Sequence, residues 1–189
     1  MNTAVIVGAV RTAVGRKNGK LSGVRPDDLL ALTLNELVAR TKVDPNEVED
    51  VVVGCVSKVG EQGFNIARNA ALIAGFPLDV CGTTLDRMCG SGQQAANFAA
   101  MGIMAGQYEV VMAGGVENMT RVPMGSDGQG PGDGPLSPKL SERYNIIPQG
   151  LSAELIAEKW GLKREELDEF SAQSHEKAGR AIAEGRFKR

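Results

Sequence analysis

Short apolar segments alternate with helical patterns along the first 115 residues, and this alternation limits the fold more than any other feature. Strands are expected at 4–10 (AVIVGAV), 51–56 (VVVGCV), 81–86 (CGTTLD) and 109–113 (EVVMA). Helices are expected from Pro26, where Leu30, Leu34, Leu37 and Val38 form one apolar stripe, over 65–74 and over 90–105. Strands that are apolar along their whole length are typical of a parallel sheet covered by helices on both faces. The pattern therefore predicts an α/β fold with a largely parallel sheet.

The character of the chain changes after Met119. Residues 121–150 contain five of the eight prolines and six of the 24 glycines, and they show little periodicity. A loop of this length is uncommon inside a compact domain unless it is functional. Two further helices are expected after it, over 152–160 and about 163–184. The chain is therefore expected to consist of two parts, 1–118 and 119–189.

Composition excludes several classes of protein. The 21 Lys and Arg residues nearly balance the 23 Asp and Glu residues, and this gives no reason to expect nucleic acid or an anionic membrane as a partner. No stretch approaches the ~18 apolar residues of a membrane span. Three scattered cysteines are too few for a disulfide framework or a zinc site. We therefore expect a soluble protein of a reducing compartment, the cytoplasm, without a bound metal.

Cys89 lies where an expected strand turns sharply into an expected helix, within TTLDRMCGSG. This arrangement resembles a nucleophile elbow with cysteine in place of serine, and the flanking glycines allow a substrate to approach the backbone. A helix N-terminus favours a thiolate and offers N–H groups to a developing oxyanion. The alternative is a buried structural cysteine at a helix start. The glycines favour the interpretation of Cys89 as a nucleophile.

Several segments together resemble the thiolases, that is, acetyl-CoA acetyltransferases and 3-ketoacyl-CoA thiolases. They are CGSGQQAA (89–96) after TTLDRM, AGGVENMT (113–120), the opening VIVGAVRTAVGRKNGKLSGV, GCVSKVGEQGFNIARNAAL (54–72) and the closing SAELIAEKWGLKREELDEFSAQSHEKAGRAIAEGRF. The resemblance implies an α/β thiolase half at 1–118, with a mixed, mostly parallel sheet and helices on both faces. It also implies that residues 119–189 are the start of the inserted loop domain of that family.

The resemblance implies an acyltransferase of fatty acid metabolism in which Cys89 forms an acyl-thioester and its backbone N–H helps to hold the oxyanion. Coenzyme A is then a co-substrate, and no cofactor is expected. Leu140 and Gln149 are the expected contacts on the pantetheine side. Short-chain biosynthetic thiolases have a His-Met pair before Gly150, where this chain has Pro148 and Gln149. This difference favours a degradative enzyme or one that accepts a broader range of chain lengths.

Thiolases are about twice this length, and their second half carries further catalytic motifs. These are a Gly-His-Pro histidine, a Cys-x-Gly cysteine and an Asn-Glu-x-x-Phe asparagine, and none of them occurs in the 189 residues. The chain is then a fragment, one subunit of a split thiolase, or a genuinely short protein. We expect it to be inactive alone, to need a second polypeptide carrying the other half, and to assemble as a dimer or tetramer.

The remaining reactive side chains are expected to be structural. His175, the only histidine, lies far from Cys89 in the sequence and outside the motif of the family histidine, so the base is expected outside this chain. Glu117 is expected to stabilise a turn, and Cys55 and Cys81 to be small core residues. Two other functions remain open: a non-catalytic thiolase-fold subunit, and a condensing enzyme of the ketoacyl-synthase or hydroxymethylglutaryl-CoA-synthase type.

Overall fold

The computed structural model describes residues 2–188, which fall into two compact units divided between Gly134 and Pro135. We call them the core unit and the helical unit. The division predicted from the sequence, between residues 118 and 119, rests on composition and family resemblance rather than on compactness, and it stays a prediction.

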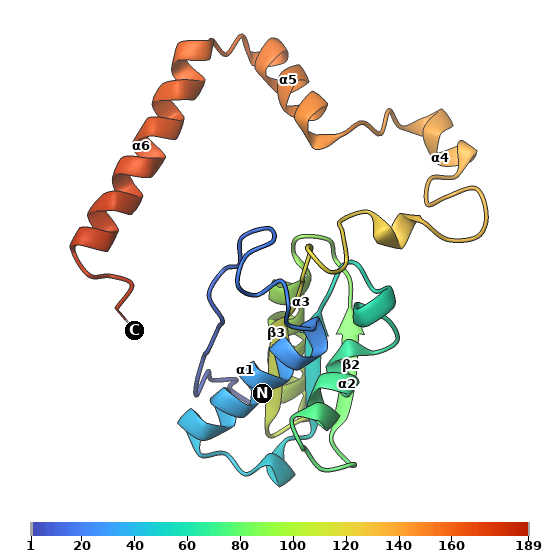
Figure 1. Ribbon diagram of the computed structural model, residues 1–189, viewed down its shortest axis with the longest axis vertical. Helices are drawn as coiled ribbons and strands as arrows, with labels where there is room; N and C mark the ends of the chain where they lie inside the picture. Colours follow the sequence, from blue (N-terminus) through green and yellow to red (C-terminus); the bar gives the residue numbers. More distant parts are fainter. Residues whose placement is uncertain (1, 189) are drawn as a thin grey trace. The chain divides into compact units, whose positions relative to one another are not determined.

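The core unit is built on a parallel sheet of three strands, β1 (Asp50–Gly54), β2 (Cys81–Leu85) and β3 (Val111–Gly115), in the order β2-β1-β3 (Figure 1). All five residues of the central strand β1 are buried. Its three valines are β-branched and suit a strand that is covered on both faces. The predicted strands at 51–56, 81–86 and 109–113 are confirmed to within a few residues.

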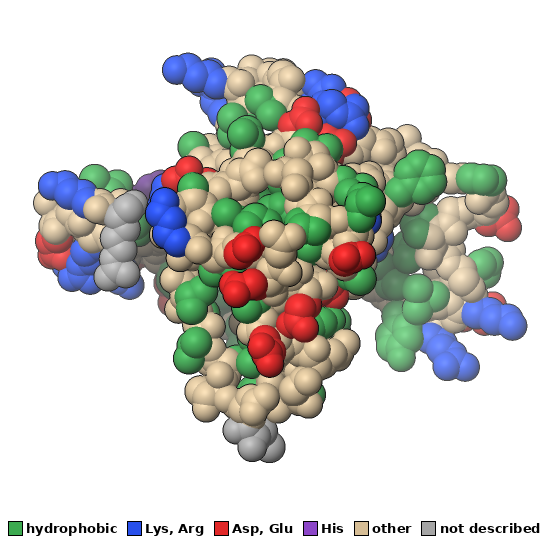
Figure 2. Space-filling model, turned by 90° about the horizontal axis from the view of Figure 1, so that it is seen from below, with side chains coloured by type: hydrophobic (Ala, Val, Ile, Leu, Met, Phe, Trp, Pro, Cys, Tyr) green, Lys and Arg blue, Asp and Glu red, His purple; other side chains and the backbone are tan. Residues whose placement is uncertain are grey.

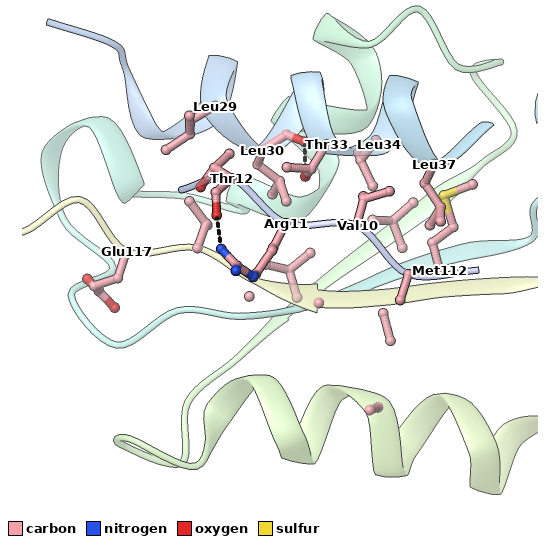
Figure 3. Close-up of a pocket in the computed structure, with 18 of the residues that line it drawn as sticks. Val10, Arg11, Thr12, Leu29, Leu30, Thr33, Leu34, Leu37, Met112 and Glu117 are labelled. Carbon is pink, nitrogen blue, oxygen red and sulfur yellow. Dashed lines mark hydrogen bonds between the residues drawn. The ribbon is translucent and has the colours of Figure 1, made fainter. Parts of the chain in front are cut away.

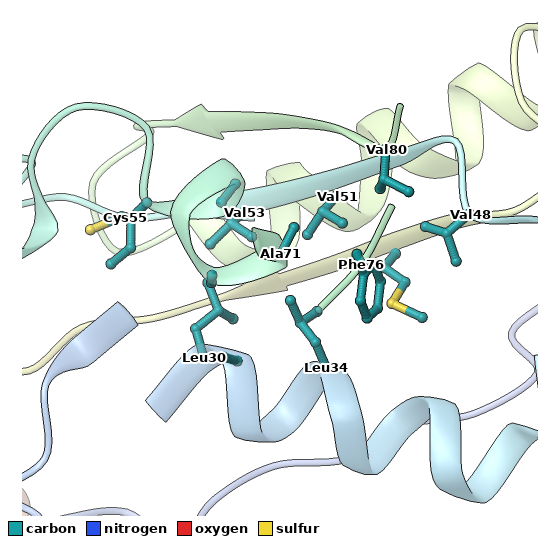
Figure 4. Packing of buried hydrophobic residues seen from close by; sticks show 14 residues of the cluster. Leu30, Leu34, Val48, Val51, Val53, Cys55, Ala71, Phe76 and Val80 are labelled. Atoms are coloured by element: carbon teal, nitrogen blue, oxygen red, sulfur yellow. The ribbon is translucent and has the colours of Figure 1, made fainter. Parts of the chain in front are cut away.

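Helices cover both faces of the sheet, as predicted. Helices α1 (Pro26–Thr41) and α2 (Ile66–Ile73) share a core with one face, where Leu30 and Leu34 point toward Val51 and Val53 (Figure 4). Helix α3 (Ser91–Ala105) packs against β1 and β3 from the other face (Figure 3). The sheet is therefore held as the middle layer of three.

The helix ends follow the chemistry expected from the sequence. Pro26 begins α1, and the side chain of Asn65 accepts a hydrogen bond from the backbone N–H of Arg68 at the start of α2. Gly106 ends α3 in the left-handed conformation that glycine adopts without strain. Short 3-10 helices lie at η1 (Pro45–Glu47), η2 (Gly60–Gln62) and η3 (Ser126–Gly128).

The predicted strand at 4–10 is wrong. Residues 2–16 form no regular structure, and Val5, Ile6 and Val7 are 70%, 91% and 75% exposed. A run of β-branched residues favours an extended backbone, but a strand also needs a partner. No residue of this segment pairs with β1, β2 or β3, and the three strands pair only with one another in the described part of the chain.

The helical unit contains α4 (Pro138–Arg143), α5 (Gln149–Trp160) and α6 (Arg164–Ala183). Helices α5 and α6 confirm the two predicted at the end of the chain, whereas α4 lies in a segment that was predicted to be a loop. None of the residues described in these three helices is buried. Among residues 2–188, no helix is both long enough and apolar enough to cross a membrane.

Candidate active site

The three strands end side by side, with Gly54 in register with Leu85 and with Gly115. The loops that follow them, 55–65, 86–90 and 116–125, therefore leave the sheet at the same edge, which we call the carboxyl edge. In open parallel sheets the carboxyl ends of the strands are the usual place for a ligand. Cys89, the residue predicted as nucleophile, lies in the loop 86–90, which follows β2.

Cys89 is exposed in a tight turn between β2 and α3, which we call the Cys89 turn (residues 86–90). The hydroxyl of the buried Ser91 donates to the carbonyl oxygen of Met88 at 2.6 Å and accepts from the backbone N–H of Arg87 at 2.8 Å. The Asp86 carboxylate accepts from the backbone N–H of Met88 at 2.7 Å. The strand, turn and helix predicted around Cys89 are present, and hydrogen bonds on both sides of the cysteine fix the turn.

Glycines bring the start of α3 directly onto the strand ends. A Cβ atom at Gly54 would lie 2.3 Å from the carbonyl carbon of Ser91 and 2.4 Å from the nitrogen of Gly92. A Cβ atom at Gly115 would lie 3.4 Å from the Cα of Gly92. Only glycine at 54 lets the backbone of α3 approach this closely, so these contacts set the position of the Cys89 turn.

Glu117 joins the loop after β3 to the loop after β1. Its carboxylate accepts from the backbone N–H groups of Val56 at 2.9 Å and Ser57 at 3.3 Å, and from the side-chain amide of Gln62 at 2.6 Å. Gln62 is fully buried, and its carbonyl oxygen accepts from the backbone N–H of Asn118 at 2.7 Å. These contacts fit the structural role predicted for Glu117.

Ion pairs brace the same edge. Arg121 forms an ion pair with Glu61, and Arg25 pairs with both Glu61 and Asp27. The hydrogen bond from Arg121 lowers the pKa of Glu61. Ion pairs thus connect the loop after β1 with the loop after β3 and with the segment before α1.

The other two cysteines differ from each other. Cys55 is buried, as predicted, and burial together with the nearby Glu117 carboxylate raises the pKa of its thiol to about 12. Cys81 is exposed, so its prediction as a core residue is wrong. It opens β2, which is an edge strand of the described sheet and is not covered on its outer side.

A groove of about 1360 Å³ in the core unit is separate from the Cys89 turn. Its walls come from the segment 4–18, the helices α1 and α3, the strands β1 and β3, and the loop 116–124 (Figure 3). Within residues 2–188, Cys89 is not among the residues that line it. The groove is mostly apolar.

The other residues predicted for the site lie in the helical unit. Leu140 is on α4, Gln149 begins α5, and His175 is exposed on α6. The contacts predicted for Leu140 and Gln149 stay predictions. Sequence reasoning missed Gln62 and Asp86, because no local pattern marks a side chain whose partners lie on other loops or in a turn. Within residues 2–188, no three His, Cys, Asp or Glu side chains are grouped to hold a metal.

Comparison with known proteins agrees with this architecture. Residues 4–189 match the thiolase N-terminal domain. The chain belongs to the thiolase family. This thiolase chain is 47% identical over 195 residues to the steroid 3-ketoacyl-CoA thiolase FadA6 of Mycobacterium tuberculosis, with 99% of this chain and 48% of that protein covered. It is 48% identical over 191 residues to a 3-ketoacyl-CoA thiolase of Idiomarina loihiensis, again with 99% and 48% covered.

A solved structure supports the fold of this thiolase chain. The acetyl-CoA acetyltransferase of Bacillus anthracis matches with a TM-score of 0.81 and 39% identity, over 100% of this chain and 50% of that one. The family and the fold expected from the sequence are thereby confirmed. The chain spans about half the length of the relatives that it matches.

Proposed function

We propose that this chain supplies the nucleophile of a thiolase, which cleaves 3-ketoacyl-CoA with coenzyme A or, in reverse, condenses two acyl-CoA molecules. The observation that carries the proposal is the exposed Cys89 in a hydrogen-bonded turn between β2 and α3. Family membership supports the reaction class, because the relatives that it resembles are named as thiolases or as an acetyl-CoA acetyltransferase.

In the cleavage direction, the Cys89 sulfur attacks the 3-keto carbon and its thiol proton passes to a base. The bond between carbons 2 and 3 then breaks, and the electron pair left on carbon 2 takes up a proton, which releases acetyl-CoA. The shortened acyl group remains on Cys89 as a thioester. The thiol of coenzyme A attacks this thioester, releases the shortened acyl-CoA and returns the Cys89 thiol.

The start of α3 contributes to these steps through its backbone. Each tetrahedral intermediate carries an oxyanion, and the backbone N–H of Cys89 is the proposed donor to it. A donor of this kind contributes about 10²–10³-fold to the rate of acyl transfer.

The base and the proton donor come, in this proposal, from a second polypeptide that carries the other thiolase half. Helix α3 exposes Phe98, Met101 and Met104, an apolar surface of the kind that a partner covers. Among residues 2–188, β2 and β3 each have a paired strand on one side only, and open strand edges favour association. We propose a dimer or tetramer of the complete assembly.

The helical unit is proposed to hold the pantetheine arm of the acyl-CoA, with Leu140 and Gln149 as contacts. Support for these two residues comes from the family resemblance of the segment 140–150. The three free cysteines fit a reducing compartment such as the cytoplasm.

The test is 3-ketoacyl-CoA cleavage by the purified chain, measured with and without a polypeptide that carries the second thiolase half. We expect no multiple turnover by the chain alone and turnover after the second half is added, with Cys89→Ala inactive in both cases. Acid and base groups contribute about 10²–10⁴-fold each, so the chain alone should fall below detection. Turnover by the chain alone would contradict the need for a partner. A mixture that binds but shows no turnover would favour a non-catalytic subunit.

A further inference from the structure

The residue before Cys89 has an unusual backbone conformation. Met88 has φ +48°, in the left-handed region that favours glycine, and the residue is 67% exposed. Burial of the side chain therefore does not compensate for the strain. A residue in this region keeps its conformation only when the contacts around it impose it, and such residues are frequent at functional sites.

Two side chains impose the conformation of Met88, one from each side of the turn. Ser91 donates to the Met88 carbonyl oxygen at 2.6 Å, and the Asp86 carboxylate accepts from the Met88 N–H at 2.7 Å. Ser91 is buried within α3, whereas Asp86 precedes the turn. The peptide groups before and after Met88 are thus both held, and their orientation determines where the following residue, Cys89, begins.

Asp86 is itself held from a different loop. The Lys58 ammonium lies 3.7 Å from the other carboxylate oxygen of Asp86. Lys58 follows Val56 and Ser57, whose backbone N–H groups donate to Glu117. A chain of polar contacts therefore runs from the loop after β3, through the loop after β1, to the Cys89 turn.

We propose that Asp86 is a positioning residue for Cys89, with Lys58 as its supporting partner. The proposal rests on the proposed function, since it concerns the geometry of acyl transfer to Cys89. Acyl transfer requires the sulfur and the backbone N–H of Cys89 to face the same carbonyl group. Alkylation by a small reagent requires only an accessible sulfur. Loss of the Asp86 contact should therefore impair acylation of Cys89 more than its alkylation.

The test compares Asp86→Asn, which keeps a carbonyl acceptor for the Met88 N–H, with Asp86→Leu, which has a similar size and no acceptor. For each variant, mass spectrometry measures the rate at which acetyl-CoA acetylates Cys89 and the rate at which iodoacetamide alkylates it. We expect Asp86→Leu to lower the ratio of the two rates by about tenfold or more, because small misplacements of a reacting group are costly. Asp86→Asn should keep the ratio within about threefold of wild type, and Lys58→Met should lower it by a similarly small factor.

An unchanged ratio in Asp86→Leu would overturn the proposal, as would an equal loss in Asp86→Asn and Asp86→Leu. If Asp86→Leu does not fold, Asp86→Ala decides by the same ratio. If wild-type Cys89 is not acetylated even after the polypeptide with the second thiolase half is added, the proposed function is contradicted, and hydrogen exchange of the Met88 amide then decides the positioning role. Faster exchange in Asp86→Leu but not in Asp86→Asn would support that role, and unchanged exchange in both would overturn it.

Discussion

The carboxyl ends and the amino ends of the three strands differ in how their buried polar groups are hydrogen-bonded. At the carboxyl edge, Gln62, Glu117, Asp86 and Ser91 form hydrogen bonds that connect loops distant in the sequence or hold the Cys89 turn. At the opposite edge, which we call the amino edge, the buried Asp50 accepts from the Tyr108 hydroxyl at 2.9 Å with one carboxylate oxygen. Its other oxygen is buried without a hydrogen-bond partner among residues 2–188.

The surfaces of the two edges differ as well. Acidic side chains gather over the face seen from below in Figure 2. Exposed acidic residues lie in the segments that lead into the strands: Glu47, Glu49, Asp79 and Glu109. An acidic surface would repel the anionic acyl-CoA of the proposed reaction, whereas the carboxyl edge exposes the thiol of Cys89 on a fixed turn. The comparison indicates that this fold concentrates precise geometry at one edge and uses the other to connect helices to strands.

The largest effect should come from filling the close approach at the carboxyl edge. Gly54→Ala would place a methyl group against the backbone of α3, which cannot move aside as a flexible side chain can. We expect the free energy of unfolding in urea to fall by about 3 kcal/mol or more. Gly114→Ala is the matched control, because a Cβ atom there meets nothing within 4 Å, and it should cost less than about 1 kcal/mol. Equal costs would show that the contact between α3 and β1 is not tight.

The three cysteines are expected to differ in their rates of alkylation. At pH 8, Cys55 should react with iodoacetamide at least about 100-fold more slowly than Cys81 and Cys89, since it is buried and its thiol has a pKa of about 12. Cys89 should react fastest because it alone lies in the exposed turn that leads into α3. Mass spectrometry of each cysteine peptide measures the rates, and the unfolded chain in urea is the control. Cys81 reacting as fast as Cys89 would contradict the special role of the turn.

A smaller effect is expected at the amino edge. Tyr108→Phe removes the hydroxyl group that donates to Asp50 and leaves the buried carboxylate without that donor. We expect the free energy of unfolding to fall by about 1–2 kcal/mol, and by less when Asp50→Asn is also present. Tyr144→Phe, at an exposed tyrosine, is the control and should have no measurable effect. A cost for Tyr108→Phe that does not change with Asp50→Asn would contradict coupling between the two side chains.

The smallest expected effect is the pH dependence of the stability that the Glu61–Arg121 ion pair contributes. The hydrogen bond from Arg121 lowers the pKa of Glu61 in the folded state. The pair therefore adds stability above the pKa of an unfolded glutamate, about 4.3, and this contribution is lost as the pH falls through the lower folded value. Urea unfolding of wild type and Glu61→Gln should differ at pH 7 and converge at acidic pH. Arg121→Met should produce the same change, and a difference that grows toward low pH would reverse the assigned sign.

Local sequence patterns predicted most helices and strands of the core unit, because the residues of each element themselves mark its buried face. The valines of β1 and the apolar stripe of α1 specify buried faces without knowledge of their partners. The strand predicted at 4–10 was wrong because strand pairing depends on contacts with residues distant in the sequence, and the β-branched residues of the segment do not specify those contacts. The prediction that Cys81 is a core residue was wrong for the same reason, since only the order of the strands makes β2 an edge strand.

The candidate site was predicted in part. Cys89 was recognised because a strand, a turn, glycines and a helix follow one another in the sequence. Gln62 was not, because its partner Glu117 lies 55 residues further along the chain. Asp86 was not recognised either, because its effect depends on the backbone angle of Met88, which no residue type specifies.

The proposal that Cys89 accepts an acyl group is tested most directly by incubating the chain with acetyl-CoA. The mass of each cysteine peptide is then measured. The Cys89 thiol takes the acetyl group, and coenzyme A leaves with the thiol proton. The account predicts slow, single acetylation of Cys89, with no comparable modification of the exposed Cys81 and none in Cys89→Ala. Acetylation of Cys81 at the same rate, or no acetylation of Cys89, would contradict the claim that the turn between β2 and α3 is built for acyl transfer.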